Sequence, residues 1–140
     1  MSKNCRFAVA VHTCTLLGMS DGQPLTSDWI AGSVNTNPVV IRRLLSSLAK
    51  AGLVTSIRGS NGGSVLARLP EAITLLDIQQ AVDEDTEPAL HNQPPNQKCP
   101  VGRGIQPVLR RVIDRAEAAR EAVLSTTLLA EVITGIKACS

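Results

Sequence analysis

Residues 35–68 read NTNPVVIRRLLSSLAKAGLVTSIRGSNGGSVLAR, and the elements predicted in this segment indicate the fold class. Pro38 suits the first position of a helix, because it lacks the N–H that would be unpaired there, and Asn37 before it can cap the helix. Gly52 suits the left-handed position that follows a helix end. We therefore predict a helix from Pro38 to Ala51, with an inward face formed by Val40 or Ile41, Leu44, Leu45 and Leu48.

A two-stranded hairpin is predicted directly after this helix. The helical period of apolar residues ends, and residues 53–58 and 64–68 have the pattern of two short strands. Between them, residues 59–63 read GSNGG, a composition that permits the backbone angles of a tight turn. The segment therefore predicts a β hairpin whose tip is flexible and built from small residues.

Two helices are predicted before residue 35. Apolar residues recur at the spacing i, i+3, i+4 and i+7 over about residues 5–19, which predicts an amphipathic helix. Its apolar face is formed by Phe7, Ala10, Val11, Cys14 and Leu17. After a turn at 21–24, Thr26 or Ser27 can cap a short helix that runs through residue 34. The buried side of this short helix is predicted to hold Trp29, Ile30 and Val34.

Three further helices and a long loop are predicted in the second half of the chain. Thr74 and Asp77 have the spacing of a capping box, which predicts a helix over about 74–82. Residues 83–104 are rich in Pro and predict a loop. The apolar residues that follow step by 4, 3, 4, 3 and 4 positions, a heptad seam on a helix of about 20 residues. A last short helix is predicted over about 127–137.

The order helix, turn, helix, hairpin is that of a winged helix-turn-helix. Aromatic residues make up only 1% of the 140 residues, and a core of Leu, Val, Ile and Ala suits packed helices better than a sandwich of strands. The predicted fold class is therefore mainly α. It is a winged helix-turn-helix, helices with a two-stranded β wing, followed by a long C-terminal dimerisation helix.

Charged residues are distributed in blocks, although the net charge is only +2. The segment 29–70 holds no acidic residue, and its five basic residues are Arg42, Arg43, Lys50, Arg58 and Arg68. The next segment, 71–91, holds six acidic residues and no Lys or Arg. A segment that carries only positive charge is a candidate surface for a polyanion. Duplex DNA fits best, because an α-helix fits its major groove, whereas single-stranded RNA is read by aromatic stacking, and no aromatic residue lies between Trp29 and Pro70.

The predicted DNA contacts lie at the start of the helix over 38–51 and at the hairpin tip. Arg42 or Arg43 could donate two hydrogen bonds to O6 and N7 of guanine, and Asn35 and Asn37 could contact adenine or a phosphate. The small residues of the tip would let Arg58 reach the adjacent minor groove or a phosphate. The predicted DNA-binding residues are Asn35, Thr36, Asn37, Val39, Arg42, Arg43, Arg58, Ser60 and Asn61.

The heptad seam predicts self-association. A symmetric dimer covers a single apolar strip best, although the winged helix of the same chain could cover part of it. Two copies would present two recognition helices to an inverted-repeat site. The predicted dimerisation residues are Ile105, Leu109, Val112, Ala116, Ala119 and Val123. The predicted domains are a DNA-binding domain over 1–82, a loop with a candidate sensing role over 83–104, and the dimerisation helix with the C-terminal helix over 105–140.

The sequence resembles a known family of regulators. The motif LAKAGLVTSIRGSNGG at 48–63 resembles the signature of Rrf2-type transcriptional regulators. The segments ITLLDIQQAV at 73–82 and TTLLA at 126–130 continue the resemblance, which covers nearly the whole chain. Within the family, VNTNPVV at 34–40 and KCPVG at 98–102 are similar to the YwnA-like branch.

This resemblance implies a dimeric winged-helix DNA-binding regulator, usually a repressor, with a long dimerisation helix. In the family, the start of the recognition helix and the Arg of the wing contact DNA, and the matching positions here are 37–43 and Arg58. Many members bind an iron–sulfur cluster through three closely spaced cysteines in the loop before the long helix. That loop holds one cysteine here, Cys99, and one imidazole, His91, whereas a cluster normally takes four protein ligands. We therefore predict no iron–sulfur cluster, no other cofactor and no metal site.

A thiol switch is the alternative sensing device. Cys99 lies beside Lys98 and near Arg103, and positive neighbours together with exposure make a thiol more reactive. It could equally be an unreactive residue at the start of the long helix. Cys14 lies on the apolar face of the first helix, where a small buried hydrophobe is the commoner role, yet cluster-lacking members of the family include thiol sensors with a cysteine in this helix. The redox-sensing candidates are Cys99 and Cys14, and the residues identify no effector.

The sequence favours a regulator over an enzyme. The GSNGG turn lacks the Gly-Lys-Ser/Thr ending of a phosphate-binding loop, and no Cys-x-x-Cys occurs, so no catalytic residue is predicted. The competing class is a winged-helix module that binds proteins, and the absence of acidic residues over 29–70 favours DNA. We therefore predict a cytoplasmic transcriptional regulator that binds double-stranded DNA as a homodimer without membrane association.

Overall fold

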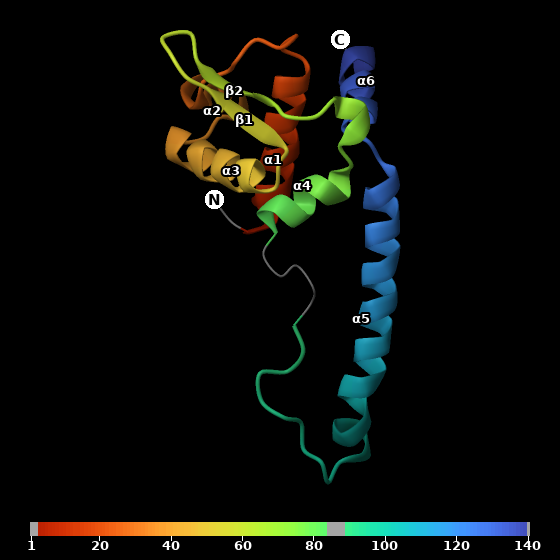
Figure 1. Ribbon diagram of the computed structural model, residues 1–140. Coiled ribbons are helices and arrows are strands. Elements are labelled where there is room, and N and C mark those ends of the chain that lie inside the picture. Colours follow the sequence, from red (N-terminus) through yellow and green to blue (C-terminus); the bar gives the residue numbers. More distant parts are fainter. Residues whose placement is uncertain (1–2, 84–88, 140) are drawn as a thin grey trace. The chain divides into compact units, whose positions relative to one another are not determined.

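The computed structural model describes residues 3–83 and 89–139 (Figure 1). In chain order, its elements are α1 (Lys3–Gly18), α2 (Ser27–Val34), α3 (Pro38–Lys50), β1 (Val54–Ile57), β2 (Gly63–Leu66), the 3-10 turn η1 (Pro70–Ala72), α4 (Leu75–Val82), α5 (Pro100–Thr126) and α6 (Leu129–Cys139). The chain divides into two compact units. The first is Met1–Glu84 together with Leu124–Ser140, and the second is Asp85–Val123.

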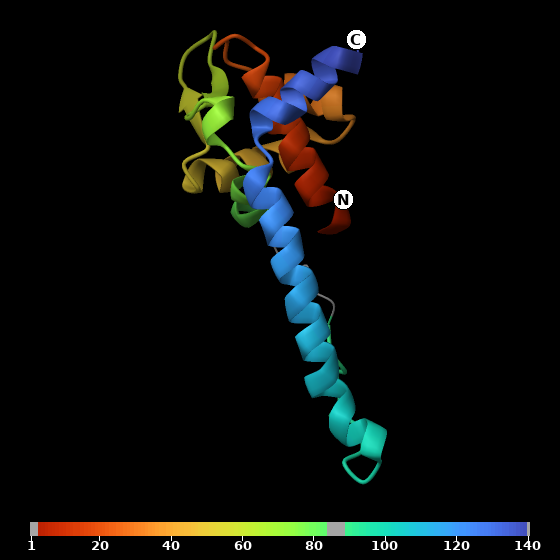
Figure 2. The same cartoon turned by 90° about the vertical axis from the view of Figure 1, so that its right-hand side faces the viewer.

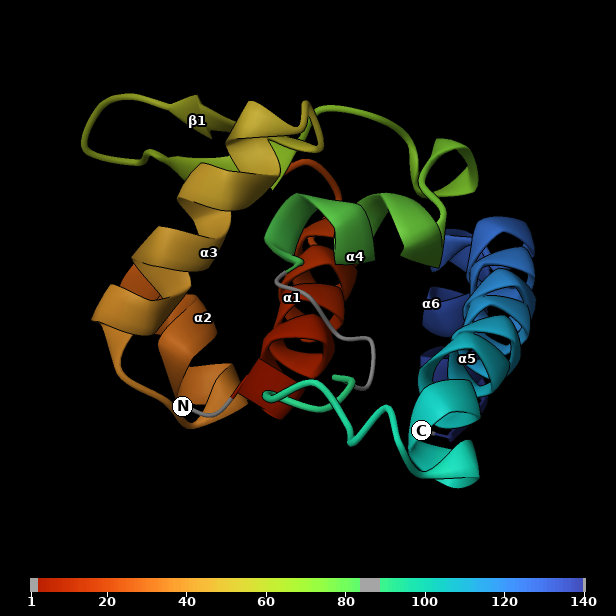
Figure 3. The same ribbon diagram turned by 90° about the horizontal axis from the view of Figure 1, so that it is seen from below.

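The first unit is built around α1. This helix contacts α2, α3, α4, α6 and β2, and Figure 3 shows it between α2 and α3 on one side and α6 on the other. The buried apolar side chains form one core, which consists of Ala10, Cys14, Leu17, Ile30, Ala31, Ile41, Leu44, Leu45, Leu48, Leu53, Val54, Ile73, Ile78, Val82, Leu129 and Ile133. This core lacks aromatic rings, and it fixes how α2, α3 and the hairpin sit on α1. The winged helix-turn-helix fold predicted from the sequence is confirmed.

The short helix α2 differs from prediction in one side chain. Thr26 is its N-cap, and the hydroxyl oxygen of Thr26 accepts a hydrogen bond from the backbone N–H of Trp29 at 3.1 Å. Ile30 is buried as expected, but the side chain of Trp29 is 55% exposed, so its predicted burial is wrong. The inward-facing positions of α2 are Ile30 and Ala31, because these two side chains face the core between α1 and α3.

The hairpin is an antiparallel pair in which Val54 lies opposite Leu66 and Ile57 opposite Gly63. The segment before α2 pairs with β2 through a single β-bridge, in which the backbones of Leu25 and Ser64 exchange two hydrogen bonds of 3.0 and 2.8 Å. Gly63 has a φ angle of 158°, and a Cβ atom there would lie 2.5 Å from the carbonyl oxygen of Leu25. Glycine is therefore required at position 63, where the wing meets the backbone of Leu25 before α2.

The C-terminal helix α6 belongs to the first unit. Leu129 N–H donates to the carbonyl oxygen of Ile73, and Leu75 N–H donates to the carbonyl oxygen of Thr127, both at 2.9 Å. Leu129 and Ile133 complete the core on this side. The structure thus divides the chain differently from the predicted domains 1–82 and 105–140, because residues 124–140 group with the N-terminal segment.

The long helix α5 has 27 residues and begins at Pro100, earlier than the predicted start at residue 105 (Figure 2). Pro100 occupies the first position of α5, which a proline tolerates because the N–H there has no partner within the helix. The earlier start of the helix is therefore indicated by Cys99 and Pro100 themselves. None of its side chains is buried in the chain as described. Of the predicted seam residues, Val112 is 54% and Val123 64% exposed, while Ala116 and Ala119 are also exposed. An apolar strip of this size is unusual on a surface that has no partner.

Replacing Thr13 by Val is expected to stabilise the fold. The side chain of Thr13 on α1 is fully buried, and its hydroxyl oxygen has no hydrogen-bond partner among the described residues. Valine keeps the shape and removes the unpaired group, so we expect the free energy of unfolding to rise by about 1 kcal/mol. Urea denaturation at fixed protein concentration measures this change.

Thr15→Val is the matched control on the same helix. The hydroxyl of Thr15 donates to the carbonyl oxygen of Val11 at 2.7 Å, so its removal loses a hydrogen bond. This variant should gain no stability. An equal gain in both variants would show that the effect comes from β-branched apolar residues in α1 rather than from the unpaired hydroxyl of Thr13.

Candidate DNA-binding surface

Three residues, Asn35, Thr36 and Asn37, form the hydrogen bonds of the turn between α2 and α3. Asn35 adopts the left-handed conformation at φ 66°, and its backbone N–H donates to the carbonyl oxygen of Ala31 at 2.8 Å. Thr36 N–H donates to the same oxygen at 3.0 Å. Asn37 caps α3, since its side-chain oxygen accepts the backbone N–H of Val39 at 2.9 Å. These bonds fix the angle at which α3 leaves the turn.

The capping hydrogen bond limits which contacts the side chain of Asn37 can make with DNA. Its side-chain oxygen is used within the chain, which leaves the amide NH₂ group as a donor. A donor of this kind can hold a phosphate oxygen, whereas the two-bond contact to adenine also needs the oxygen. Asn35 is exposed, and its side chain makes no hydrogen bond among the described contacts, so of the two it is the better candidate for adenine.

The outer face of α3 carries the positive charge. Its inner face buries Ile41, Leu44 and Leu45, which turns Arg42 and Arg43 outward. Both guanidinium groups are on exposed residues, and neither forms an ion pair among the described residues. The predicted DNA-binding residues that are exposed in the structure are Asn35, Asn37, Val39, Arg42, Arg43, Arg58, Ser60 and Asn61, while Thr36 is half-buried.

One basic side chain of the acid-free segment, that of Arg68, interacts with other residues of the same chain. The guanidinium of Arg68 lies 3.8 Å from the carboxylate of Asp77 and donates to the carbonyl oxygen of Ala72 at 3.4 Å. Arg68 therefore secures the chain between the hairpin and α4. The basic residues of the segment that remain exposed and available to an external partner are Arg42, Arg43, Lys50 and Arg58.

The wing presents Arg58 at the end of β1. The loop after it closes through a hydrogen bond from Gly62 N–H to the carbonyl oxygen of Gly59 at 3.1 Å. Ser60 and Asn61 lie at its exposed tip, where small side chains allow close approach of the backbone to a groove. This geometry suits contact with the sugar–phosphate edge of a duplex.

The structure adds Ser46 and Lys50 to the candidate surface. Ser46 is exposed on α3 four residues after Arg42, and Lys50 is exposed one turn further, so both continue the same face. The spacing of four residues between Arg42, Ser46 and Lys50 is the feature of the sequence that predicts their common face. Ile57, at the end of β1, is 45% exposed beside Arg58, in a strand whose last three residues are all exposed.

The structure shows the role of a segment whose sequence matches a catalytic motif. Residues 18–22 read GMSDG, which matches the Gly-x-Ser-x-Gly pattern of a nucleophile elbow. A nucleophile elbow joins a strand to a helix, whereas this segment follows the end of α1. The hydroxyl of Ser20 lies 2.9 Å from the carbonyl oxygens of both Leu17 and Gln23. Ser20 therefore closes a turn, and the match carries no catalytic role.

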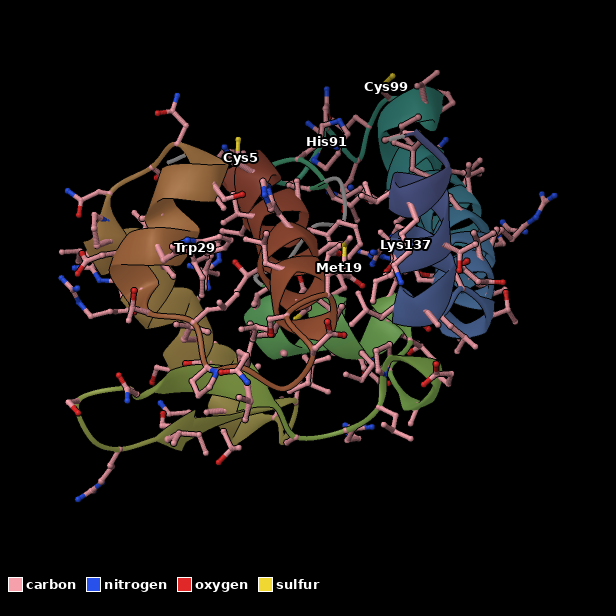
Figure 4. All side chains as sticks on the ribbon, turned by 90° about the horizontal axis from the view of Figure 1, so that it is seen from above. Cys5, Met19, Trp29, His91, Cys99 and Lys137 are labelled. Atoms are coloured by element: carbon pink, nitrogen blue, oxygen red, sulfur yellow. The ribbon has the colours of Figure 1, made fainter. Side chains whose placement is uncertain are left out.

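The two cysteine candidates differ in accessibility. Cys14 is fully buried in the core, and loss of solvation raises the pKa of its thiol from 9.0 to about 12. Cys99 is exposed immediately before α5, as Figure 4 shows, and Cys5 and Cys139 are exposed as well. Because the thiolate is the reactive form, burial disfavours Cys14 as a redox sensor and leaves Cys99 as the better candidate.

Thiol labelling is expected to separate these cysteines. In the folded protein at pH 8, iodoacetamide should modify Cys99 and the two exposed terminal cysteines, while Cys14 reacts at least about 100-fold more slowly, because its pKa near 12 keeps the thiol protonated. Raising the pH towards 11 should accelerate the labelling of Cys14, since its thiolate fraction is still rising there. Peptide mass spectrometry after timed quenching gives the rates, and full labelling in urea is the control. Rapid labelling of Cys14 in the folded chain would contradict its burial.

Comparison with known proteins places the chain among bacterial regulators. The Rrf2 family, described as "Iron-dependent Transcriptional regulator", matches residues 3–135. YwnA of Bacillus subtilis (strain 168), named as an HTH-type transcriptional regulator, is 41% identical over 130 residues, which are 93% of this chain and 96% of YwnA.

Solved structures agree in fold. A crystal structure described as that of a DNA-binding protein has a TM-score of 0.73 and 38% identity, and covers 91% of this chain and 98% of its own. The structure of CymR, the "Global Cysteine Regulator" of B. subtilis, has a TM-score of 0.69 and 25% identity, and covers 96% and 97% of the two chains. The long helix and the wing are thus found in experimental structures of related proteins.

The family description raises the question of iron. Among residues 3–83 and 89–139, no three His, Cys, Asp or Glu side chains gather in a way that could hold a metal ion. The loop before α5 holds the single thiol of Cys99, with His91 as its imidazole. The described donor set, with one thiol and one imidazole in this loop, therefore does not fit an iron centre within one chain.

The fold, the exposed basic face and the comparisons lead to one assignment. No helix in the part of the chain that the structure describes has both the length and the hydropathy to cross a membrane. The related proteins are regulators of transcription, not enzymes. The family match spans nearly the whole sequence and includes the wing, α5 and the first part of α6. This chain belongs to the Rrf2 family and is a winged-helix transcriptional regulator.

Proposed function

We propose that the protein binds an inverted-repeat operator as a homodimer and represses the neighbouring genes. Each subunit inserts the start of α3 into the major groove and lays the wing, residues 58–63, along the adjacent minor groove or backbone. The observation that carries this proposal is the outer face of α3. It presents Arg42 and Arg43 to solvent in a segment, 29–70, that has no acidic residue to repel phosphate.

Each residue of this surface has a role that follows from its chemistry. Arg42 or Arg43 donates two hydrogen bonds to a guanine, and the other neutralises a phosphate. Asn35 contacts a base or phosphate beside the turn, while Asn37 and Thr36 hold the turn and donate to the backbone of the duplex. Arg58, with Ser60 and Asn61 beside it, contacts the backbone or the minor groove next to the recognition helix.

The apolar strip on α5 supports the homodimer. Its six residues, Ile105, Leu109, Val112, Ala116, Ala119 and Val123, fall on one helix face, and none of them is buried in the chain as described. Two antiparallel or crossed copies would bury this strip, and Ala116 and Ala119 would allow close approach of the helices. A two-fold dimer then presents two recognition helices to two half-sites.

The proposed site of sensing is the segment before α5. Cys99 is exposed there and reachable by an oxidant or an electrophile, which makes it the candidate through which a thiol signal alters operator affinity. Because the operator is chromosomal DNA, we propose that the protein acts in the bacterial cytoplasm.

Selection of genomic fragments by the purified protein tests the proposed function. The enriched fragments should share an inverted repeat with half-site centres about 10 base pairs apart or a multiple of that spacing. Affinity for this repeat should fall steeply as salt rises, because several phosphate contacts per dimer release counterions. No enriched sequence, or an affinity that does not change with salt, would contradict DNA binding and favour a module that binds another protein.

A further inference from the structure

We propose that Val39 reads the methyl group of a thymine in the operator, an inference that rests on the proposed function. Val39 is the second residue of α3, and its side chain is 42% exposed although it is apolar. The next two apolar residues differ, since Val40 is half-buried and Ile41 fully buried. Val39 is therefore an apolar side chain that the core of its own chain does not use.

The position of Val39 limits what it can contribute to a bound duplex. Its backbone N–H donates to the side-chain oxygen of Asn37 at 2.9 Å, so this N–H is not available to a phosphate or a base. What remains exposed is a pair of methyl groups on a β-branched side chain, which has few rotamers in a helix and so stays in place. A rigid apolar group of this size matches one methyl group on its partner.

The neighbours of Val39 indicate where this partner methyl lies. Arg42 and Arg43 follow at i+3 and i+4 on the same face of α3, and both are exposed. When these two side chains reach base edges and phosphates, Val39 is carried to the base edges near the start of the helix. In the major groove, the one apolar group that bases present is the C5 methyl of thymine. The half-site is thus expected to contain a thymine one or two steps from the guanine read by Arg42 or Arg43.

Replacing thymine by deoxyuracil tests this inference, because the exchange removes only the methyl group. Each thymine of the selected half-site is replaced in turn, and affinities are measured by fluorescence anisotropy for wild type and Val39→Ala. At one position, wild type should lose about 4-fold in affinity per half-site, the value of burying about one methyl group. Val39→Ala should bind the thymine operator about as weakly as wild type binds the uracil operator, and should lose nothing further at that position.

Val101→Ala is the matched control, since it makes the same change at an exposed valine on α5. It should keep the full sensitivity of wild type to deoxyuracil. The inference is overturned if wild type binds tightly with no position sensitive to deoxyuracil, or if Val39→Ala keeps every sensitivity of wild type, and in both cases the proposed function stands. Failure of wild type to select any DNA overturns the proposed function itself, so the two failures are distinguishable.

Discussion

Reversing both charges on the outer face of α3, Arg42→Glu and Arg43→Glu, is expected to abolish operator binding. In the proposed homodimer, this change removes four positive charges from the surface that faces DNA and places four carboxylates against phosphate. We expect affinity to fall by about 1000-fold or more, because the guanine contact and the phosphate contacts are lost together. Anisotropy titration with the selected operator measures the loss. The fold should be unchanged, because both residues are exposed and lie outside the core.

Lys98→Glu with Arg103→Glu is the matched control for this variant. It makes the same change in net charge at two exposed residues before and in the first turn of α5. This control should lose far less affinity, through long-range repulsion alone. If both double variants lost affinity equally, the operator would respond to net charge and not to the face of α3. If the α3 variant kept full affinity, the proposed orientation on DNA would be wrong.

Placing a carboxylate in the middle of the α5 strip, Ala116→Asp, is expected to dissociate the proposed homodimer. A seam between two helices would bury this charge in each subunit without a partner, at a cost of several kcal/mol. The dimer dissociation constant should rise by at least about 100-fold. Operator affinity should fall with it, since a single subunit contacts one half-site. Sedimentation equilibrium gives the first quantity and anisotropy titration the second.

Ala118→Asp provides the control for the dimer prediction. It is the same substitution two residues further along α5, on an exposed residue that the heptad pattern places outside the strip. The dimer should persist in this variant, and helix propensity is changed equally in both. Dissociation in both variants would mean that a different face of α5 associates, whereas a dimer in both would place the contact elsewhere in the chain.

Features set by neighbouring residues could be predicted from the sequence. Asn37 caps α3, Thr74 and Asp77 form a capping box, and Gly52 follows α3 at a positive φ angle of 77°. Each depends on hydrogen bonds or backbone angles within a few residues, so composition at a fixed spacing is sufficient to indicate it. The apolar period of α3 likewise depends only on helix geometry and a buried side.

Features set by distant segments could not be predicted in the same way. Whether Trp29 faces the core depends on which elements cover α2, and Ile30 with Ala31 occupies that side instead. Arg68 looked available in the charge pattern, but Asp77 lies within 3.8 Å of it once α4 is in place. These outcomes depend on how elements pack, and charge or hydropathy along the chain does not contain that information.

The residues of the candidate DNA-binding surface include features of both kinds. The exposed run on α3 could be predicted, because helical spacing follows from the burial of its opposite face. That the side-chain oxygen of Asn37 is occupied by the N–H of Val39 became clear only from the structure, and it changes which contacts Asn37 can make.

The hydrogen bonds between 73–75 and 127–129 have a consequence for synthesis of the protein. Leu129 and Ile133 come from the last element of the chain, yet they close the core on which α3 is held. A nascent chain that has emerged from the ribosome only as far as α4 lacks this side of its core. The core of the first unit therefore closes only after α6 has been made, later than α5, the helix proposed to pair two copies.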